Sequence, residues 1–172
     1  MPYYKHREYK LSFLLRHDDS GAVDEHGWRD VSELIENHNY TLDELCEIVV
    51  NNNKQRFEFS KDKTLIRARQ GHSIKVDVEL EESMPPAVLY HGTASCFLDS
   101  INEKGILKGE RLHVHLSDTV GTAVKVGKRH GDPVVLKIDA QKMHEDGIKF
   151  YLSRNNVWLT DYVEAKYIVE VL

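Results

Sequence analysis

The segment 81–86, with the sequence EESMPP, separates two parts of the chain whose hydrophobic patterns differ. Its two adjacent prolines favour an extended connector, because proline fixes its own backbone and restricts the residue before it. Before this segment apolar residues recur at helical spacing, and after it they alternate as they do in strands. A chain of 172 residues is long enough for one ordinary domain or two small ones. We therefore expect an α+β protein with two lobes, residues 1–83 and residues 87–172.

The first part is predicted to begin with helices. Apolar residues at helical spacing in the segment 11–15 lead directly into Arg16 and His17. Two capping-box sequences, Asp30–Glu33 and Thr41–Glu44, each place a carboxylate three residues after an N-cap oxygen. The apolar residues behind them predict two further helices of about 8–12 residues each.

A hairpin is predicted to follow these helices. Residues 56–60 and 64–70 have strand patterns, and the polar segment 61–63 forms the tip between them. Helices followed by a hairpin suggest a winged-helix module of about 80 residues. Relatives of the helix-turn-helix use this arrangement against nucleic acid, although it also serves as a plain scaffold.

The second part is predicted to be mostly β. A helix over residues 94–104 ends at Gly105, which suits a C-cap, and a short helix covers residues 122–128. The predicted strands are residues 88–90, 113–116, 133–139, 150–153, 157–160 and 167–171.

Charge and composition limit the classes of function. The net charge is −5, and the first 83 residues, with 12 basic and 17 acidic side chains, carry all of it. Any contact with nucleic acid must therefore come from a few well-placed cations. No apolar run can cross a bilayer, no secretory signal is evident, and Cys46 and Cys96 make neither a disulfide framework nor a zinc knuckle. We expect a soluble monomer in the cytoplasm, or in the nucleus if the source is eukaryotic.

Two groups of cations in the first part are candidates for holding a phosphate. Arg16 and His17 follow an apolar helix, where an ordinary C-terminal cap is the alternative explanation. Arg67 and Arg69 alternate on one strand face before Gly71, which would let the backbone approach a ligand. A solvated strand face is the alternative for these arginines.

Two motifs in the second part have similar chemistry. His91-Gly92-Thr93 is predicted at a strand end before a helix, whose backbone N–H groups can bind an anion; it could equally be a plain turn. Arg111, His113 and His115 are predicted on one strand face. A metal would need further ligands, and none is evident among the cysteines or carboxylates, so a phosphate or nucleotide surface fits better.

The sequence lacks the common templates for other enzymes. It contains no GxGxxG, GxxxxGK[ST], GxSxG or HExxH motif. What remains is a set of arginines and histidines without an evident nucleophile, acid or metal. Such a set suits the binding and stabilisation of phosphate charge.

The motifs, taken in order, closely resemble the RNA 2′-phosphotransferase family. They are LLRH, DEHGW, IRARQGHS, LYHGT, RLHVHLS, VGKRHG and FYLSRNNVWLT, and the likeness runs from about Leu11 to Ile168. The resemblance implies an N-terminal winged-helix RNA lobe packed on a C-terminal ADP-ribosyltransferase-like, mostly-β lobe that binds NAD. It implies no metal.

The resemblance also implies roles for particular residues. The family's active-site Arg-His-Arg-Arg set falls on Arg16, His17, Arg69 and Arg111. The implied NAD-binding residues are His91, Gly92, Thr93, His113, His115 and Ser117. The expected RNA-binding residues are Arg67, Gln70, Gly71, His72 and Ser73.

The implied reaction is NAD-dependent removal of an internal RNA 2′-phosphate, and the implied partner is 2′-phosphorylated RNA, such as a tRNA in splicing. An RNA 2′-phospho-ADP-ribose intermediate gives 2′-hydroxyl RNA, ADP-ribose 1″,2″-cyclic phosphate and nicotinamide. Two alternatives remain open. One is ADP-ribosylation of terminal nucleic-acid phosphates, and the other is a non-catalytic winged-helix regulator that senses NAD or ADP-ribose.

Overall fold

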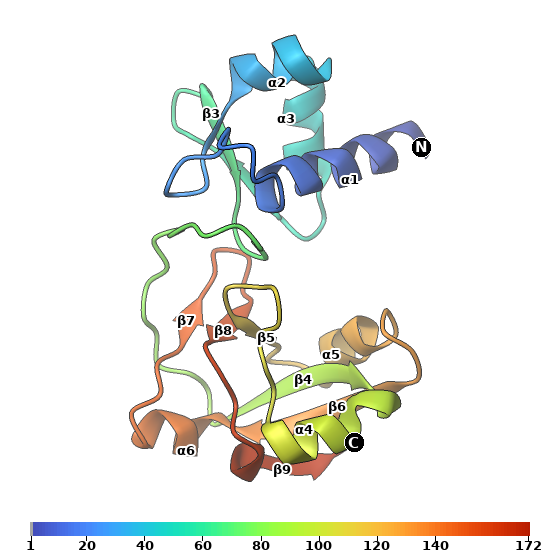
Figure 1. Ribbon diagram of the computed structural model, residues 1–172, viewed down its shortest axis with the longest axis vertical. Coiled ribbons are helices and arrows are strands. Elements are labelled where there is room, and N and C mark those ends of the chain that lie inside the picture. Colours follow the sequence, from blue (N-terminus) through green and yellow to red (C-terminus); the bar gives the residue numbers. More distant parts are fainter. Residues whose placement is uncertain (1) are drawn as a thin grey trace. The chain divides into compact units, whose positions relative to one another are not determined.

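The computed structural model describes residues 2–172, which form two compact units with mixed α/β structure (Figure 1). The first unit ends at Glu79 and the second spans Leu80–Leu172. Their assignment to an RNA lobe and an NAD lobe stays a prediction. Within the described residues, no helix has the length and apolar character that a membrane crossing requires.

The first unit contains three helices and one three-stranded antiparallel sheet, with strand order β1-β3-β2. In chain order its elements are α1 (Pro2–Arg16), β1 (Arg29–Asp30), α2 (Val31–His38), α3 (Leu42–Asn51), β2 (Phe57–Phe59) and β3 (Leu65–Ala68). The predicted helices and hairpin are confirmed, because β2 pairs antiparallel with β3 across the predicted tip. The pairing of β1 with β3 was not predicted.

Both capping-box sequences start helices, but only half of each predicted box forms. The side chain of Asp30 accepts from the Ser32 backbone N–H, and that of Thr41 accepts from the Glu44 N–H. The two carboxylates of these boxes bind arginines instead of returning to the N-cap. Arg29 Nε donates to Glu33 Oε2 at 2.7 Å, and Arg7 Nε donates to Glu44 Oε1 at 2.6 Å.

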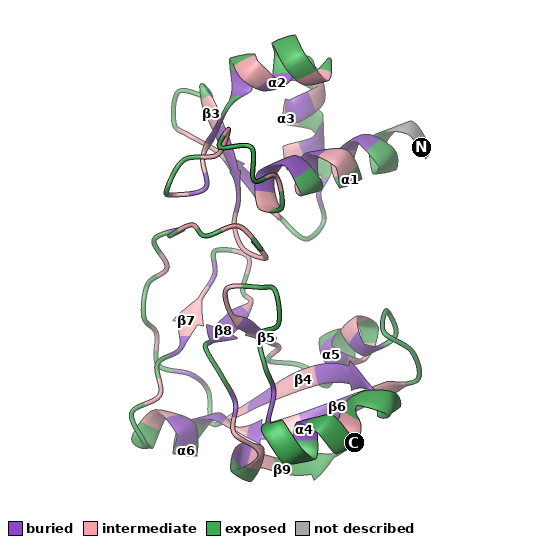
Figure 2. Cartoon of the chain, in the orientation of Figure 1, coloured by how far each residue is buried: buried purple, intermediate pink, exposed green. Residues whose placement is uncertain are grey.

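The core of the first unit lies between the helices and the sheet. One side of α1 is buried in it and the other is exposed, as the alternating colours along this helix show (Figure 2). The core residues are Leu11, Leu14, Leu15, Val31, Leu34, Tyr40, Leu45, Ile48, Phe57, Ile66 and Ala68.

The second unit contains two three-stranded antiparallel sheets, with strand orders β4-β6-β9 and β5-β8-β7. In chain order its elements are β4 (Val88–Ala94), the 3-10 helix η1 (Ser95–Phe97), α4 (Leu98–Lys104), β5 (Val114–Leu116), α5 (Val120–Gly127), β6 (Pro133–Asp139), α6 (Ala140–Glu145), β7 (Tyr151–Leu152), β8 (Trp158–Thr160), the 3-10 helix η2 (Ala165–Tyr167) and β9 (Ile168–Val171). All six predicted strands are present within a few residues, whereas α6 was not predicted.

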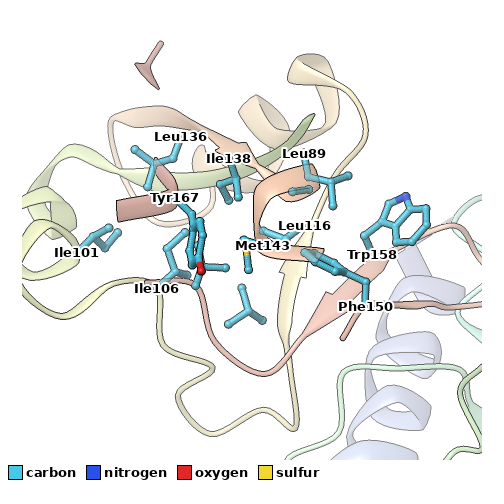
Figure 3. Packing of buried hydrophobic residues seen from close by; sticks show 13 residues of the cluster. Leu89, Ile101, Ile106, Leu116, Leu136, Ile138, Met143, Phe150, Trp158 and Tyr167 are labelled. Atoms are coloured by element: carbon cyan, nitrogen blue, oxygen red, sulfur yellow. The ribbon is translucent and has the colours of Figure 1, made fainter. Parts of the chain in front are cut away.

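The core of the second unit is shared by the two sheets. Phe150, Met143 and Tyr167 lie among aliphatic side chains from the strands, with Trp158 at one side of the cluster (Figure 3). The sheets are joined at one point, where Tyr90 and Ser117 exchange two backbone hydrogen bonds of 2.8 Å. This bridge fixes β4 against the end of β5.

The His91-Gly92-Thr93 motif lies near the end of a strand before helical segments, as predicted. It occupies the last part of β4, which ends at Ala94, and η1 and α4 follow from Ser95. Gly92 is needed for packing: a Cβ there would lie 1.8 Å from the Ala123 carbonyl oxygen of α5. The close approach that glycine permits is therefore made by the neighbouring helix α5.

Candidate functional site

In the first unit, the end of α1 is held by the chain that follows β3. The carbonyl oxygen of Arg16 accepts hydrogen bonds from the backbone N–H groups of Ser73, at 3.0 Å, and Ile74, at 3.3 Å. The N–H of His17 still bonds to the Phe13 carbonyl at 2.8 Å, which extends the helical pattern past Arg16. The structure thus brings two sequence-distant predicted site segments, 16–17 and 71–73, into contact.

His17 is exposed and is held from two sides. Its Nδ1 lies 2.8 Å from the hydroxyl oxygen of Ser73, and its ring lies 5.9 Å, centre to centre, from the ring of Phe13. Ser73 was predicted to bind RNA. Its observed partner is His17, so its hydroxyl is in a position to orient the imidazole.

Arg16 lies against Gly71. The guanidinium donates from Nη1 to Ser12 Oγ at 3.0 Å, and its Cζ lies 5.9 Å from the centre of the Phe57 ring. Gly71 has a φ of +88°, a conformation that favours glycine, and a Cβ there would lie 3.5 Å from Arg16 Cζ. The structure therefore gives Gly71 a neighbour from the chain itself, where the sequence suggested a ligand.

The two alternating arginines of β3 and its extension have different environments. Arg67 is 3% exposed; its Nε donates to Glu58 Oε1 at 2.8 Å, and its guanidinium stacks 4.2 Å from the centre of the Trp28 ring. The side chain of Arg69 is 20% exposed. Its Nε lies 3.4 Å from Glu58 Oε2, an ion pair without hydrogen-bond geometry, and its Nη1 donates to Gln55. Arg67 thus has a structural role, and Arg69 retains access to solvent.

His72 is buried, which does not suit a direct RNA contact. Burial, together with the nearby charges of Arg16, His17 and Arg67, lowers the pKa of His72 to about 3, so the ring is neutral. Its Nε2 has no hydrogen-bond partner among the described residues, and neither has Gln70 Oε1. Gln70 is half-buried as a residue, but its Oε1 atom is buried like Nε2 of His72.

A cavity of about 440 Å³ opens beside His17 and Ser73. Four of its lining residues are acidic, and Asp18 among them forms an ion pair of 2.6 Å with Arg29. Carboxylates disfavour a phosphate inside this cavity. The lining residues are His17, Asp18, Asp19, Gly21, Val23, Asp24, Glu25, Ser73, Ile74, Lys75 and Val76.

In the second unit, the Tyr90–Ser117 bridge places His91 next to His115. His91 Nδ1 lies 3.1 Å from the His115 carbonyl oxygen, and burial lowers the pKa of His91. Because a carbonyl only accepts, Nδ1 carries the proton and Nε2 of the neutral ring is an acceptor. The bridge and this hydrogen bond fix the two histidine motifs relative to each other.

Arg111 also contacts His115, but it lies outside strand β5 and not on the strand face where it was predicted. It precedes β5, and its Nη1 donates to His115 Nδ1 at 3.0 Å. The surrounding protein and the charge of Arg129 lower the pKa of Arg111, although the residue is exposed. Within the described chain, no carboxylate forms an ion pair with Arg111. Cations that repel each other without a counter-ion form an environment that suits an anion.

The remaining predicted residues of the second unit lie apart from this contact. His113 packs against the Tyr151 ring at 5.7 Å and lies 4.0 Å from Asp161, and burial lowers its pKa. Thr93 is buried where α5 packs on β4. Ser117 is half-buried, and its recorded contacts are the backbone bonds to Tyr90.

Arg129 and His130 were not predicted as site residues. The charge of Arg129 acts on Arg111, and that of His130 acts on His91. Both follow α5, and a signal was present in the VGKRHG motif. The sequence gave no indication that the residues after α5 lie close to Arg111 and His91.

Comparisons with known proteins agree on one family. Residues 8–162 match the family model described as RNA 2′-phosphotransferase, Tpt1 / KptA family. A protein of Acaryochloris marina named probable RNA 2′-phosphotransferase is 52% identical over 169 residues, covering 94% of this chain and 93% of that protein. Proteins with the same name from Flavobacterium johnsoniae and Pseudomonas fluorescens are 52% and 49% identical, covering 92% of this chain and 91% and 92% of their own lengths.

Proposed function

Because this chain belongs to the RNA 2′-phosphotransferase (Tpt1/KptA) family, we propose that it removes an internal 2′-phosphate from RNA by transferring it to NAD. The observation that carries the proposal is the contact between the end of α1 and the segment after β3. It holds Arg16 and His17 beside a segment that begins with Arg69. These groups supply positive charge and a hydrogen-bond donor without a metal.

We assign the two units different substrates. The three helices and β1-β3-β2 sheet of the first unit fit a winged-helix lobe that binds RNA. The two antiparallel sheets of the second unit fit an ADP-ribosyltransferase-like lobe that binds NAD. Arg111 and Arg129, with no carboxylate paired to Arg111 in the described chain, suit the diphosphate of a dinucleotide or the transferred phosphate.

The first step is an attack by an oxygen of the RNA 2′-phosphate on C1″ of the nicotinamide ribose. The C1″–O bond forms as the C1″–N bond breaks, and nicotinamide leaves with the bonding electron pair. A phosphate dianion is already nucleophilic, so the protein mainly holds the two substrates in line. His91, His115 and Ser117 are the residues we expect along the dinucleotide, with His113 at its edge, whereas Gly92 and Thr93 pack under α5 and support this strand from behind.

In the second step, the ribose 2″-hydroxyl attacks the phosphorus of the intermediate. The P–O bond to the RNA 2′-oxygen breaks as the new P–O bond forms; the 2″-hydroxyl loses its proton, and the RNA leaves with a 2′-hydroxyl after gaining one. Arg16, Arg69 and Arg111 stabilise the charge that develops on the phosphoryl oxygens. His17 supplies a proton or hydrogen bond to the departing oxygen, because an imidazole titrates near working pH.

The direct test uses a short RNA with one internal 2′-phosphate, incubated with and without NAD and in the presence of EDTA. We expect NAD-dependent loss of the phosphate and formation of ADP-ribose 1″,2″-cyclic phosphate. The Arg69→Ala and Arg111→Ala variants should accumulate the RNA–ADP-ribose species. Absence of NAD-dependent phosphate loss would reject the proposal, and a stable ADP-ribosylated RNA end would support transfer to terminal phosphates instead.

A further inference from the structure

The solvent side of α1 presents a line of rings that ends at His17. Tyr9 is 78% exposed and Phe13 is 53% exposed. They are four residues apart, as are Phe13 and His17, so all three side chains lie on one side of the helix. The opposite side of α1 is buried in the core of the first unit through its leucines.

This line of rings is continuous with the proposed catalytic histidine. The Phe13 and His17 rings lie 5.9 Å apart and are tilted by 44°. Each residue of a helix adds 1.5 Å along its axis, so positions four apart are separated by about 6 Å. Aromatic rings at such intervals can each receive one base of a single strand, because every base has a flat face.

The charges on α1 favour a polyanion on the same side. Lys5 lies four residues before Tyr9 and Lys10 lies three residues before Phe13, so each lysine neighbours one of the rings on the helix surface. Lys5 is exposed and Lys10 is half-buried. Glu8 is the single acidic residue of the sequence of α1, and it points to Asn52 and Arg56, at 2.6 Å and 3.1 Å. Positive charge and exposed rings thus coincide on one helix face in a part of the chain that is otherwise acidic.

Scattered exposed aromatic residues are ordinary on protein surfaces and carry no argument singly. The side of α1 differs because its rings form a line, contact His17 and are flanked by cations. We name Lys5, Tyr9, Lys10 and Phe13 the α1 face.

We propose that the α1 face binds the single-stranded RNA that flanks the 2′-phosphorylated nucleotide. Bases stack on Tyr9 and Phe13, Lys5 and Lys10 neutralise backbone phosphates, and the 2′-phosphate is presented to His17. This inference rests on the proposed function, because it assigns a substrate segment to the same site. It makes single-stranded RNA, and not the closed stem of a duplex, the element that the first unit recognises beside the phosphate.

The test compares two substrates, a 2′-phosphorylated dinucleotide and a longer single strand that contains the same dinucleotide. The readout is the ratio of kcat/KM for the long and the short substrate. The wild-type protein should prefer the long strand. A Tyr9→Leu/Phe13→Leu variant, which keeps apolar side chains on the helix but loses the rings, should lower this ratio about 5- to 20-fold.

The matched control is Phe97→Leu, which removes an aromatic side chain that is 47% exposed on η1 in the second unit. It should leave the ratio at its wild-type value. Phe13→Tyr should restore the preference that Phe13→Leu loses, because it restores a ring. A ratio that stays unchanged in the double leucine variant would overturn the inference.

A binding measurement separates this inference from the proposed function. Fluorescence anisotropy with a labelled single-stranded RNA that lacks any 2′-phosphate needs no turnover. We expect the affinity of the wild-type protein for this RNA to fall as the salt concentration rises, and to fall less steeply in the Lys5→Gln/Lys10→Gln variant. At a fixed salt concentration, the double leucine variant should bind the RNA more weakly than the wild-type protein. Wild-type protein that turns over 2′-phosphorylated RNA but shows neither binding nor a length preference would overturn the inference and leave the proposed function standing. RNA binding that depends on these rings, without turnover of 2′-phosphorylated RNA, would support the inference and reject the proposed function.

Discussion

The Nδ1 atom of His17 lies 2.8 Å from the hydroxyl oxygen of Ser73. A second acceptor, the Arg16 carbonyl, lies 3.5 Å from the same hydroxyl but already receives two backbone N–H groups. The Ser73 hydroxyl therefore donates its hydrogen bond to Nδ1 of a neutral His17, whose single ring proton is then on Nε2. When His17 is protonated, Nδ1 donates to Ser73 and the hydroxyl turns to the carbonyl. Ser73 thus serves both charge states of the ring.

We predict that Ser73→Ala lowers kcat about 10-fold, because an unoriented imidazole is a poorer proton donor. The KM for NAD should stay unchanged, since Ser73 belongs to the first unit and the residues proposed to bind NAD belong to the second. Ser73→Thr keeps the hydroxyl and should restore most of the rate. The pH dependence of kcat should also shift in Ser73→Ala and return in Ser73→Thr. An unshifted pH profile in Ser73→Ala would mean that Ser73 does not act through His17.

Arg67 and Arg69 should give opposite results when each is replaced by alanine. Arg67→Ala leaves the buried Glu58 without its closest partner and should lower the free energy of unfolding by about 3 kcal/mol or more. Arg69→Ala should cost about 1 kcal/mol in stability but reduce kcat at least about 100-fold. Urea unfolding and single-turnover assays on both variants check this. Equal losses of activity at full stability would place both arginines at the substrate.

Gly92→Ala should destabilise the second unit severely. The added Cβ would meet the Ala123 carbonyl oxygen at 1.8 Å, so α5 would have to move away from β4. We expect a loss of more than about 4 kcal/mol in the free energy of unfolding, or no folded protein. Gly121→Ala in α5 is the control, because nothing lies within 4 Å of its Cβ and alanine favours helix by about 0.5–1 kcal/mol. Wild-type stability of Gly92→Ala, followed by Trp158 fluorescence, would contradict this packing.

His72 should make the first unit sensitive to mild acid. The folded pKa of His72 is about 3 and the ordinary value is 6.5, so between these values the unfolded chain binds one more proton. Stability is therefore unaffected above 6.5 and falls as pH drops through this window, by about 1.4 kcal/mol per pH unit at most. The urea midpoint followed by the Trp28 indole NMR signal measures it.

His72→Phe should remove most of this slope above the range in which carboxylates titrate. His26 is a separate control, because hydrogen bonding to the Asp77 carbonyl raises the pKa of its exposed ring, so its contribution to stability is complete below pH 6.5 and is lost as pH rises above that value. His26→Gln should therefore leave the acid loss below pH 6.5 unchanged. A slope that stays the same in His72→Phe would show that the ring is not held neutral in the fold.

Local patterns in the sequence predicted the elements of this fold well. The N-cap residues Asp30 and Thr41, the hairpin tip at 61–63 and the C-cap Gly105 act over three or four residues, and each is found as predicted. The short helix α6 was not predicted, because its six residues give too little periodicity to separate it from a loop.

The environment of the candidate site residues depends on longer-range packing, which the sequence does not show. Arg67 and Arg69 have the same spacing and charge, and only the position of Glu58 and Trp28 makes one structural and leaves the other accessible. In the same way, Gly92 indicated a close approach, but the approaching group is the backbone of α5. The pairing of His17 with Ser73 joins residues 56 positions apart and follows from how β3 ends against α1.

Glu33 lies in the first turn of α2 and Glu44 in the first turn of α3. Each carboxylate pairs with a largely buried arginine: hydrogen bonding to Arg29 lowers the pKa of Glu33, and hydrogen bonding to Arg7 lowers the pKa of Glu44. Neither helix can unravel at its start without removing a carboxylate from a largely buried guanidinium, although Arg29 would keep its second partner, Asp18. The amide protons of α2 and α3 should therefore exchange with solvent through one shared opening event that includes α1, and not by separate fraying of each helix.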